Sequence, residues 1–228
     1  GDGALDTKKS HHITHSYNHF FDNGKCNLQG ANASDTSNYI TYHHNWFDHS
    51  DSRHPRVRVA TVHVYNNYYD GNSKYGIGST TDSDIFAENN YFRNCKYPML
   101  TSKQGSDDET GGTFSGEVGG VIKAYGNIIE GAKAFVPYSE NPSAYDAYVA
   151  ASRDEKVPSS VKAISGGASY NNFDTASDFY SYNVDAAADV PSVVMAKAGR
   201  VDGGDFKWEF NDAVDDTDYG VNSALKSA

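Results

Sequence analysis

The sequence predicts an all-β fold, a parallel β-helix, and three observations lead to this expectation. The composition favours strands and turns, because the 228 residues include 21 Gly, 17 Tyr and 11 Phe but only 2 Met. An Asn followed two residues later by a large apolar residue occurs five times, at intervals of 27, 22, 23 and 37 residues. A β-branched aliphatic residue stands five positions before each of these Asn residues. Such spacing is typical of a solenoid, whereas the turns of a β-sandwich recur about every 8–12 residues.

Each repeat is expected to contain a strand, a tight turn at the Asn, and a second strand whose first inward residue is the apolar one. The Asn residues are Asn18, Asn45, Asn67, Asn90 and Asn127. The aliphatic residues are Ile13, Ile40, Val62, Ile85 and Ile122, and the apolar ones are Phe20, Phe47, Tyr69, Phe92 and Ile129. Because stacked strands lie about 4.8 Å apart, Asn amides in equivalent turns can bond from coil to coil. We therefore expect an asparagine ladder and an inward aromatic stack.

The repeats also predict how the domain is organised. Residues 1–174 are expected to form the coils, and residues 175–228 a covering segment of the same domain, with a short helix over residues 190–198. A weaker repeat at Asn172, with Gly167 in the aliphatic position, indicates a sixth coil. Segments 102–120 and 133–160 are rich in Gly, Ser, Asp and Glu, so they are expected to leave the coils as long loops beside a binding face.

Charge and cysteine content exclude several classes of protein. With 19 Lys and Arg against 30 Asp and Glu, the net charge of −11 argues against nucleic acid or an anionic membrane surface as a partner. No apolar run is long enough for a membrane-spanning helix. Cys26 and Cys95 are too few for a disulfide scaffold. Three coils of about 4.8 Å would separate them by roughly 14 Å, so they are expected to be unbonded.

The densest basic cluster in this acidic chain is Arg53-His54-Pro55-Arg56-Val57-Arg58, directly before a predicted strand. Lys25 lies one coil earlier. In a β-helix, cations from consecutive coils line up along a lateral groove, where they can pair with the carboxylates of an acidic ligand. Taken alone, the cluster is more typical of solvated surface charge than of a binding site.

The cluster lies within a series of motifs that resembles polysaccharide lyase family 1, the pectate and pectin lyases. The resemblance runs from Gly1 to about Ser102 and, more loosely, to Asp174. Its motifs are Asp2-Gly3-Ala4-Leu5-Asp6-Thr7-Lys8, Ile13-Thr14 through Tyr17-Asn18, Gly24-Lys25 with Leu28 and Gly30, Ile40-Thr41-Tyr42-His43-His44-Asn45, Arg53-x-Pro55-x-x-Arg58 and Val62-His63-Val64-Tyr65-Asn66-Asn67. It implies a right-handed parallel β-helix, secreted or periplasmic, that cleaves α-1,4-polygalacturonate by calcium-dependent β-elimination. The products would be 4,5-unsaturated oligogalacturonates.

The resemblance also implies roles for individual residues. Arg53 would be the base that removes the proton at C5 of the sugar. Lys25 and Arg58 would bind uronate carboxylates, and His54, inside the arginine motif, is expected to touch the substrate. Asp2 and Asp6 would be calcium ligands, as suits a cation that prefers oxygen. Calcium and the neighbouring cations would lower the proton affinity of the base.

Further expectations follow from the resemblance, from the motifs that are absent and from the remaining His and Trp residues. Family members begin with coils before the segment that matches Gly1, so an N-terminal fragment or separate chain is expected to complete the β-helix and its calcium site. A pectin lyase and a non-catalytic pectin-binding β-helix are the alternatives; the polygalacturonase motifs Asn-Thr-Asp, Gly-His-Gly and Arg-Ile-Lys are missing. The nine His form no HExxH motif or compact His/Cys set, so zinc is not predicted. Trp46 is expected to point outward, where it could stack on a sugar.

Overall fold

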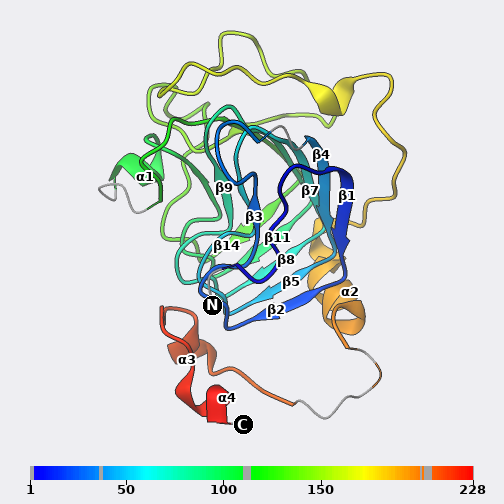
Figure 1. The fold of residues 1–228 in the computed structure, drawn as a ribbon, viewed down its shortest axis with the longest axis vertical. Helices are drawn as coiled ribbons and strands as arrows, with labels where there is room; N and C mark the ends of the chain where they lie inside the picture. The colour runs from blue at the N-terminus through cyan, green and yellow to red at the C-terminus, as the bar shows by residue number, and fades with distance from the viewer. Residues whose placement is uncertain (1–2, 36–37, 110–113, 201, 203–206, 228) are drawn as a thin grey trace.

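The computed structural model describes residues 3–35, 38–109, 114–200, 202 and 207–227. Three parallel sheets wind into a β-helix, with the covering segment along its outside (Figure 1). The six-stranded sheet contains β1 (His11–Ser16), β4 (Asn38–His43), β7 (Thr61–Tyr65), β10 (Asp84–Glu88), β13 (Val121–Tyr125) and β15 (Tyr148–Val149). The five-stranded sheet contains β2 (His19–Phe21), β5 (Trp46–Asp48), β8 (Tyr68–Asp70), β11 (Tyr91–Arg93) and β14 (Ile128–Glu130). The four-stranded sheet contains β3 (Leu28–Gln29), β6 (Arg56–Val57), β9 (Ile77–Ser79) and β12 (Met99–Thr101). The parallel β-helix predicted from the repeats is confirmed.

The coils stack in the register that the repeats predict. The aliphatic residues pair from strand to strand along the six-stranded sheet in the order Ile13, Ile40, Val62, Ile85 and Ile122. Phe20, Phe47, Tyr69 and Phe92 form the inward aromatic column, with centroid separations of 5.3, 5.1 and 4.2 Å. The four rings are buried, so this column forms the centre of the hydrophobic core.

The asparagine ladder is also confirmed, and it runs through all five predicted positions. The Asn67 side-chain amide donates to Asn90 Oδ1 at 3.1 Å, while Asn67 Oδ1 accepts from the backbone and side-chain nitrogens of Asn45. The same side-chain bond joins Asn18 to Asn45 and Asn90 to Asn127. Because both the donor and the acceptor of each inner Asn are used, the ladder satisfies buried polar groups at one corner of five successive coils.

The ladder residue is not the left-handed residue of each turn, although Asn adopts that conformation more readily than most residues. Positive φ occurs instead at the preceding residue, which is Tyr17, His44, Asn66, Asn89 or Gly126. Asn is therefore required at the ladder position for its amide, which bonds in both directions along the helix axis, and not for its backbone conformation.

The sixth coil differs from the expectation. It enters the six-stranded sheet at β15, where Tyr148 pairs with Lys123, and not at Asn172. Asn172 instead adopts a left-handed conformation before the short 3₁₀ helix η1 (Phe173–Thr175) and bonds to the backbone of Val157. Segment 133–160 is thus not wholly a loop, since it carries β15. The other insertion contains helix α1 (Ser106–Glu109).

The covering segment contains η2 (Ala187–Asp189), α2 (Val190–Lys197), α3 (Asp212–Asp215) and α4 (Ser223–Ser227). Helix α2 is the helix predicted over residues 190–198, and its Val190 and Val194 pack on Tyr68 of β8. Helices α3 and α4 lie beyond one edge of the coils in Figure 1. Among the described residues, no helix has the length and apolar character needed to cross a membrane.

Both cysteines are free, as predicted, and both are completely buried. Burial raises the pKa of the Cys26 thiol to about 12, so the thiol is protonated in the folded protein. The two side chains pack within the same core cluster as the aromatic column.

Replacing Asn67 with Ala is expected to destabilise the fold by about 3 kcal/mol or more, because it leaves the buried donors of Asn45 and the carbonyl of Tyr42 without partners. Asn18→Ala is the matched control. The Asn18 side chain lies at the half-buried end of the ladder and donates to Asn45 Oδ1, so we expect its loss to cost about 1 kcal/mol. Urea denaturation would measure both. Equal losses for the two variants would contradict a continuous ladder.

Candidate active site

Three chain segments that are distant in sequence lie side by side at the entrance to the four-stranded sheet. The Gly3 amide donates to the Lys25 carbonyl at 3.2 Å, and Thr7 forms a bridge with Gln29. One coil further on, the Asn27 amide donates to the Arg53 carbonyl at 2.7 Å. Asp6, Lys25 and Arg53 are therefore carried on consecutive, hydrogen-bonded segments. The structure brings these predicted site residues to one end of one sheet.

Strand alternation decides which side chains of the basic cluster face outward. Val57 is fully buried inside the coils, so its neighbours Arg56 and Arg58 project from the outer face of the sheet. Gly30 stands beside Arg58 on the previous coil with φ +86°, and a Cβ there would lie 2.6 Å from the Arg58 carbonyl oxygen. Only glycine permits this approach of the two coils.

Arg53 lies where the chain enters β6, half-buried and in a left-handed conformation with φ 64°. Its guanidinium interacts with the phenol of Tyr75 and acts electrostatically on Arg56. Burial, followed by the charge of Arg58, lowers the pKa of Arg56. The three arginines thus form one positively charged surface, as expected for a region that binds an acidic ligand.

A glutamate that the sequence analysis did not single out already occupies part of this surface. Glu117, from the insertion after β12, accepts from Arg58 Nε with both oxygens, at 2.8 and 2.7 Å, and from Arg56 Nη2 at 3.1 Å. Arg58 Nη1 also donates to the Gly30 carbonyl at 3.0 Å. Burial acts to raise the pKa of Glu117, but the hydrogen bond and charge of Arg58 outweigh it, so the net shift is downward.

An aromatic contact positions the segment that carries Glu117. The Phe114 ring packs against Tyr75 at 4.7 Å and lies beneath the Arg56 guanidinium at 5.6 Å. It rests on Gly78 of β9, where a Cβ would come within 2.5 Å of the ring. We call residues 114–117 the acidic strap. The insertion was expected as a loop beside a binding face, and the strap packs on Arg56 and Arg58.

The described part of the predicted calcium site is Asp6. Its carboxylate is exposed, and Oδ1 accepts from the Leu28 amide at 2.8 Å. Gly3, with φ +83°, leaves room for it, because a Cβ there would lie 2.3 Å from Asp6 Oδ2. An exposed carboxylate suits calcium, but Asp2 lies outside the described residues. Among the described residues, the groups of three metal-binding side chains gather around His49 and do not include Asp6.

His54 is a correction to the sequence analysis. It was expected to touch the substrate, but its side chain is completely buried between Phe47 and Tyr69, with Nδ1 2.9 Å from the Tyr75 carbonyl oxygen. Burial lowers its pKa to about 3, so the ring is neutral. His54 lies in the bend before β6 and not in the strand, so its ring turns inward against Phe47 and Tyr69 and belongs to the core.

Trp46 is also placed differently from the sugar-stacking role considered for it. Its ring stacks on His19 at 4.1 Å and 6°, and packs against the cluster formed with helix α2. It lies on the five-stranded sheet, away from Arg53. A separate cavity of about 600 Å³ lies over the six-stranded sheet, lined by residues that include His12, Tyr39 and Tyr180. Neither feature belongs to the arginine surface.

The chain matches a family model and is similar in sequence to known proteins. The family model described as pectate lyase matches residues 1–202. A pectate trisaccharide-lyase from Bacillus licheniformis is 41% identical over 102 residues, covering 44% of this chain and 30% of the relative. Pectate lyase 3 from Pectobacterium carotovorum is 37% identical over 107 residues, covering 46% of this chain and 29% of the relative. The chain thus spans about 30% of the length of these relatives in the matched region.

Solved structures resemble the fold over most of the chain. Pectate lyase II from Xanthomonas campestris superposes with a TM-score of 0.61 at 30% identity, covering 88% of this chain and 53% of that structure. A Bacillus pectate lyase in complex with trigalacturonate superposes with a TM-score of 0.58 at 27% identity, covering 87% of this chain and 52% of that structure.

The acidic strap is expected to make stability depend on pH. The lowered pKa of Glu117 means that its contribution is present above its ordinary value of 4.5 and is lost as the pH falls through the folded-state value. Glu117→Gln should therefore lower the free energy of unfolding by about 1 kcal/mol at pH 7, a modest loss because the ion pair is partly exposed. Once the native carboxyl is protonated, the substitution should leave the free energy of unfolding unchanged. Denaturation at pH 7 and pH 3 would test this, with exposed Glu140→Gln as the control. A cost that does not change with pH would contradict it.

Proposed function

Because this chain belongs to the pectate lyase family, we propose that it cleaves unmethylated α-1,4-polygalacturonate by β-elimination, in a secreted or periplasmic setting. The observation that carries this proposal is the alignment of Asp6, Lys25 and Arg53 on consecutive hydrogen-bonded segments. A polymer lying across the coils would meet all three side chains in turn. The arginine surface supplies the positive charge that an acidic polymer needs in a chain whose net charge is −11.

In the proposed reaction, Arg53 takes the proton from C5 of a galacturonate residue. The electron pair of the C5–H bond forms the C4–C5 double bond, and the bond from C4 to the bridging oxygen breaks. The leaving oxygen is protonated from solvent, and the new non-reducing end is 4,5-unsaturated. Lys25 binds a uronate carboxylate beside Arg53, since the backbone carrying Lys25 lies on the adjacent coil.

In this proposal, Arg58 binds substrate only where its ion pair with Glu117 allows it. Its Nε is already paired with both oxygens of Glu117. A substrate carboxylate that reaches Arg58 must therefore share the guanidinium with the acidic strap or displace it. Lys25 and Arg53 carry the first contact with substrate, and Arg58 and Arg56 bind where the strap permits.

Calcium is the cofactor we propose for this site, held by Asp6 and Asp2. Its oxygen-preferring chemistry fits the exposed Asp6 carboxylate, and when bound it would draw negative charge from the uronate carboxylate and so acidify C5. The Gly3 backbone and the Leu28 amide orient the Asp6 side chain for this purpose. A pectin lyase acting on methylated polymer would need neither the cation nor the paired basic side chains.

Replacing Arg53 by Lys or Ala is expected to lower kcat by about 10³-fold or more while leaving the folded structure intact, because the loss falls on proton transfer in the transition state. Formation of unsaturated uronide, followed by ultraviolet absorbance, measures the rate. Arg200→Ala, at an exposed ion pair, is the control and should keep full activity. Near-normal turnover by Arg53→Ala would overturn the assignment of the base.

Chelation of calcium is expected to abolish activity on polygalacturonate, and added Ca²⁺ to restore it. Asp6→Asn should raise the Ca²⁺ concentration needed for half-maximal activity, because one ligand charge is removed. The exposed Asp154→Asn is the control. Equal activity on highly methylated pectin without calcium would favour the pectin lyase. Binding of polymer with no unsaturated product would favour the non-catalytic β-helix.

A further inference from the structure

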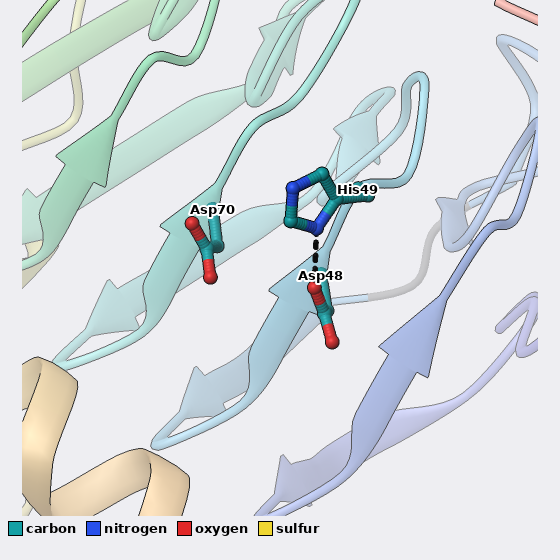
Figure 2. A group of neighbouring side chains, drawn as sticks. All are labelled: Asp48, His49 and Asp70. Atoms are coloured by element: carbon teal, nitrogen blue, oxygen red, sulfur yellow. Dashed lines mark hydrogen bonds and ion pairs between the residues drawn. The ribbon is translucent and has the colours of Figure 1, made fainter. Parts of the chain in front are cut away.

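A second charged site lies on the five-stranded sheet, away from the arginine surface. At the ends of β5 and β8, the side chains of Asp48, His49 and Asp70 gather on one side of the sheet (Figure 2). All three residues are buried. The covering segment adds Asp212 and Asp216, which stand four residues apart at the two ends of helix α3. These five side chains form one cluster, which joins the coils to the C-terminal segment.

The imidazole of His49 is the centre of this cluster. Its side chain is only 4% exposed, and Nδ1 lies 2.5 Å from Asp48 Oδ1, the contact drawn in Figure 2. On its other side, Nε2 lies 3.0 Å from Asp216 Oδ1 and 3.4 Å from Asp212 Oδ1. The Phe210 ring stacks on the imidazole at 4.3 Å and shields it. Both ring nitrogens therefore face carboxylates.

The orientation of Nε2 is the independent observation that points to a ligand. Although two carboxylate oxygens lie close to it, Nε2 makes no hydrogen bond with acceptable geometry. With the proton on Nδ1, as the contact with Asp48 favours, the Nε2 lone pair takes part in no hydrogen bond, and two carboxylate oxygens lie within 3.4 Å of it. Ligands of tetrahedral zinc, at about 2.0–2.1 Å from the metal, lie about 3.3 Å from one another. The two Nε2 separations are close to that spacing.

We propose that His49 Nε2, Asp212 and Asp216 bind a divalent transition-metal ion, with Zn²⁺ as the best fit, and that this ion fastens the C-terminal segment to the coils. An imidazole nitrogen with two carboxylates is a ligand set for zinc rather than for calcium, which prefers an oxygen shell. Asp48 holds the far side of the ring, in the carboxylate–histidine–metal arrangement that orients such ligands. The fourth position is left for water.

The local charge balance accommodates a dication. Four carboxylates, those of Asp48, Asp70, Asp212 and Asp216, meet around His49. Among the described residues, the cationic side chain within this group is Arg93, which bonds Asp70 and both oxygens of Asp216. His19 contacts Asp48 at 2.7 Å, and Asn94 donates to Asp216 at 2.8 Å. With neutral imidazoles the group carries three excess negative charges, which a dication reduces to one.

A proton on Nε2 is the competing explanation. Burial acts to lower the pKa of His49, but the hydrogen bond and charge of Asp48 outweigh it, so the pKa is raised. An imidazolium would also bridge Asp48 and Asp216. It differs from a metal in needing no added ion and in losing its effect when the pH rises, so the two explanations can be separated by experiment.

The test uses the protein stripped of metal with a chelator and then titrated with Zn²⁺ alone by calorimetry. We expect one tight site per chain and a rise in Tm, because the ion binds only the folded state. Co²⁺ in its place should show the visible absorption of a tetrahedral site. His49→Ala should abolish both signals, and Asp48→Asn should weaken binding about 10–100-fold. His12→Ala, at an exposed histidine, is the matched control.

Several outcomes would overturn the proposal. Absence of stoichiometric Zn²⁺ binding by the native chain would do so, as would unchanged binding by His49→Ala. If His49→Ala fails to fold, Asp212→Asn serves instead, since that side chain is 63% exposed and its loss should weaken Zn²⁺ binding without unfolding the chain. Undiminished binding by Asp212→Asn would also count against the site. An NMR titration that shows His49 protonated at neutral pH in the presence of Zn²⁺ would establish the proton as the bridge.

Discussion

Hydrogen bonding from coil to coil in strict register is the constraint on which the rest of the structure depends. Each strand of the six-stranded sheet pairs with the equivalent residues of its neighbours, and the asparagine ladder repeats that register at the corner. A slip of one residue would turn every inward side chain outward. It would also leave the buried Asn amides without partners. The ladder and the aromatic column therefore specify the same alignment independently.

This register also builds the candidate active site. Asp6, Lys25 and Arg53 come from three segments separated by about one coil of sequence, and they converge only because those segments are adjacent in the stack. The rigid coils supply the position, and small residues such as Gly3 and Gly30 supply the space that bulky neighbours need.

Two faces of this acidic chain carry excess charge of opposite sign. On the four-stranded sheet, the arginines outnumber the carboxylate of the acidic strap and leave a surface suited to an anionic polymer. On the five-stranded sheet, carboxylates outnumber Arg93 and leave a cluster suited to a cation. The outer surface can carry two regions of opposite charge, because outward positions are free to vary while inward positions must pack.

Local patterning by itself determined the coils of this protein. The spacing of Asn, aliphatic and aromatic residues predicted the ladder, the core columns and the free cysteines, because a repeating backbone places equivalent residues in equivalent environments. The motifs proposed Arg53, Lys25 and Asp6 as site residues, and the structure carries them on adjacent hydrogen-bonded segments. Only the tertiary structure decided that β15 supplies the sixth coil, that His54 points into the core, that Glu117 pairs with Arg58 and that helix α3 meets His49. These depend on where insertions and the C-terminal segment fold back. Contacts between residues far apart in sequence, such as His49 and Asp216, leave no periodic signal in the sequence.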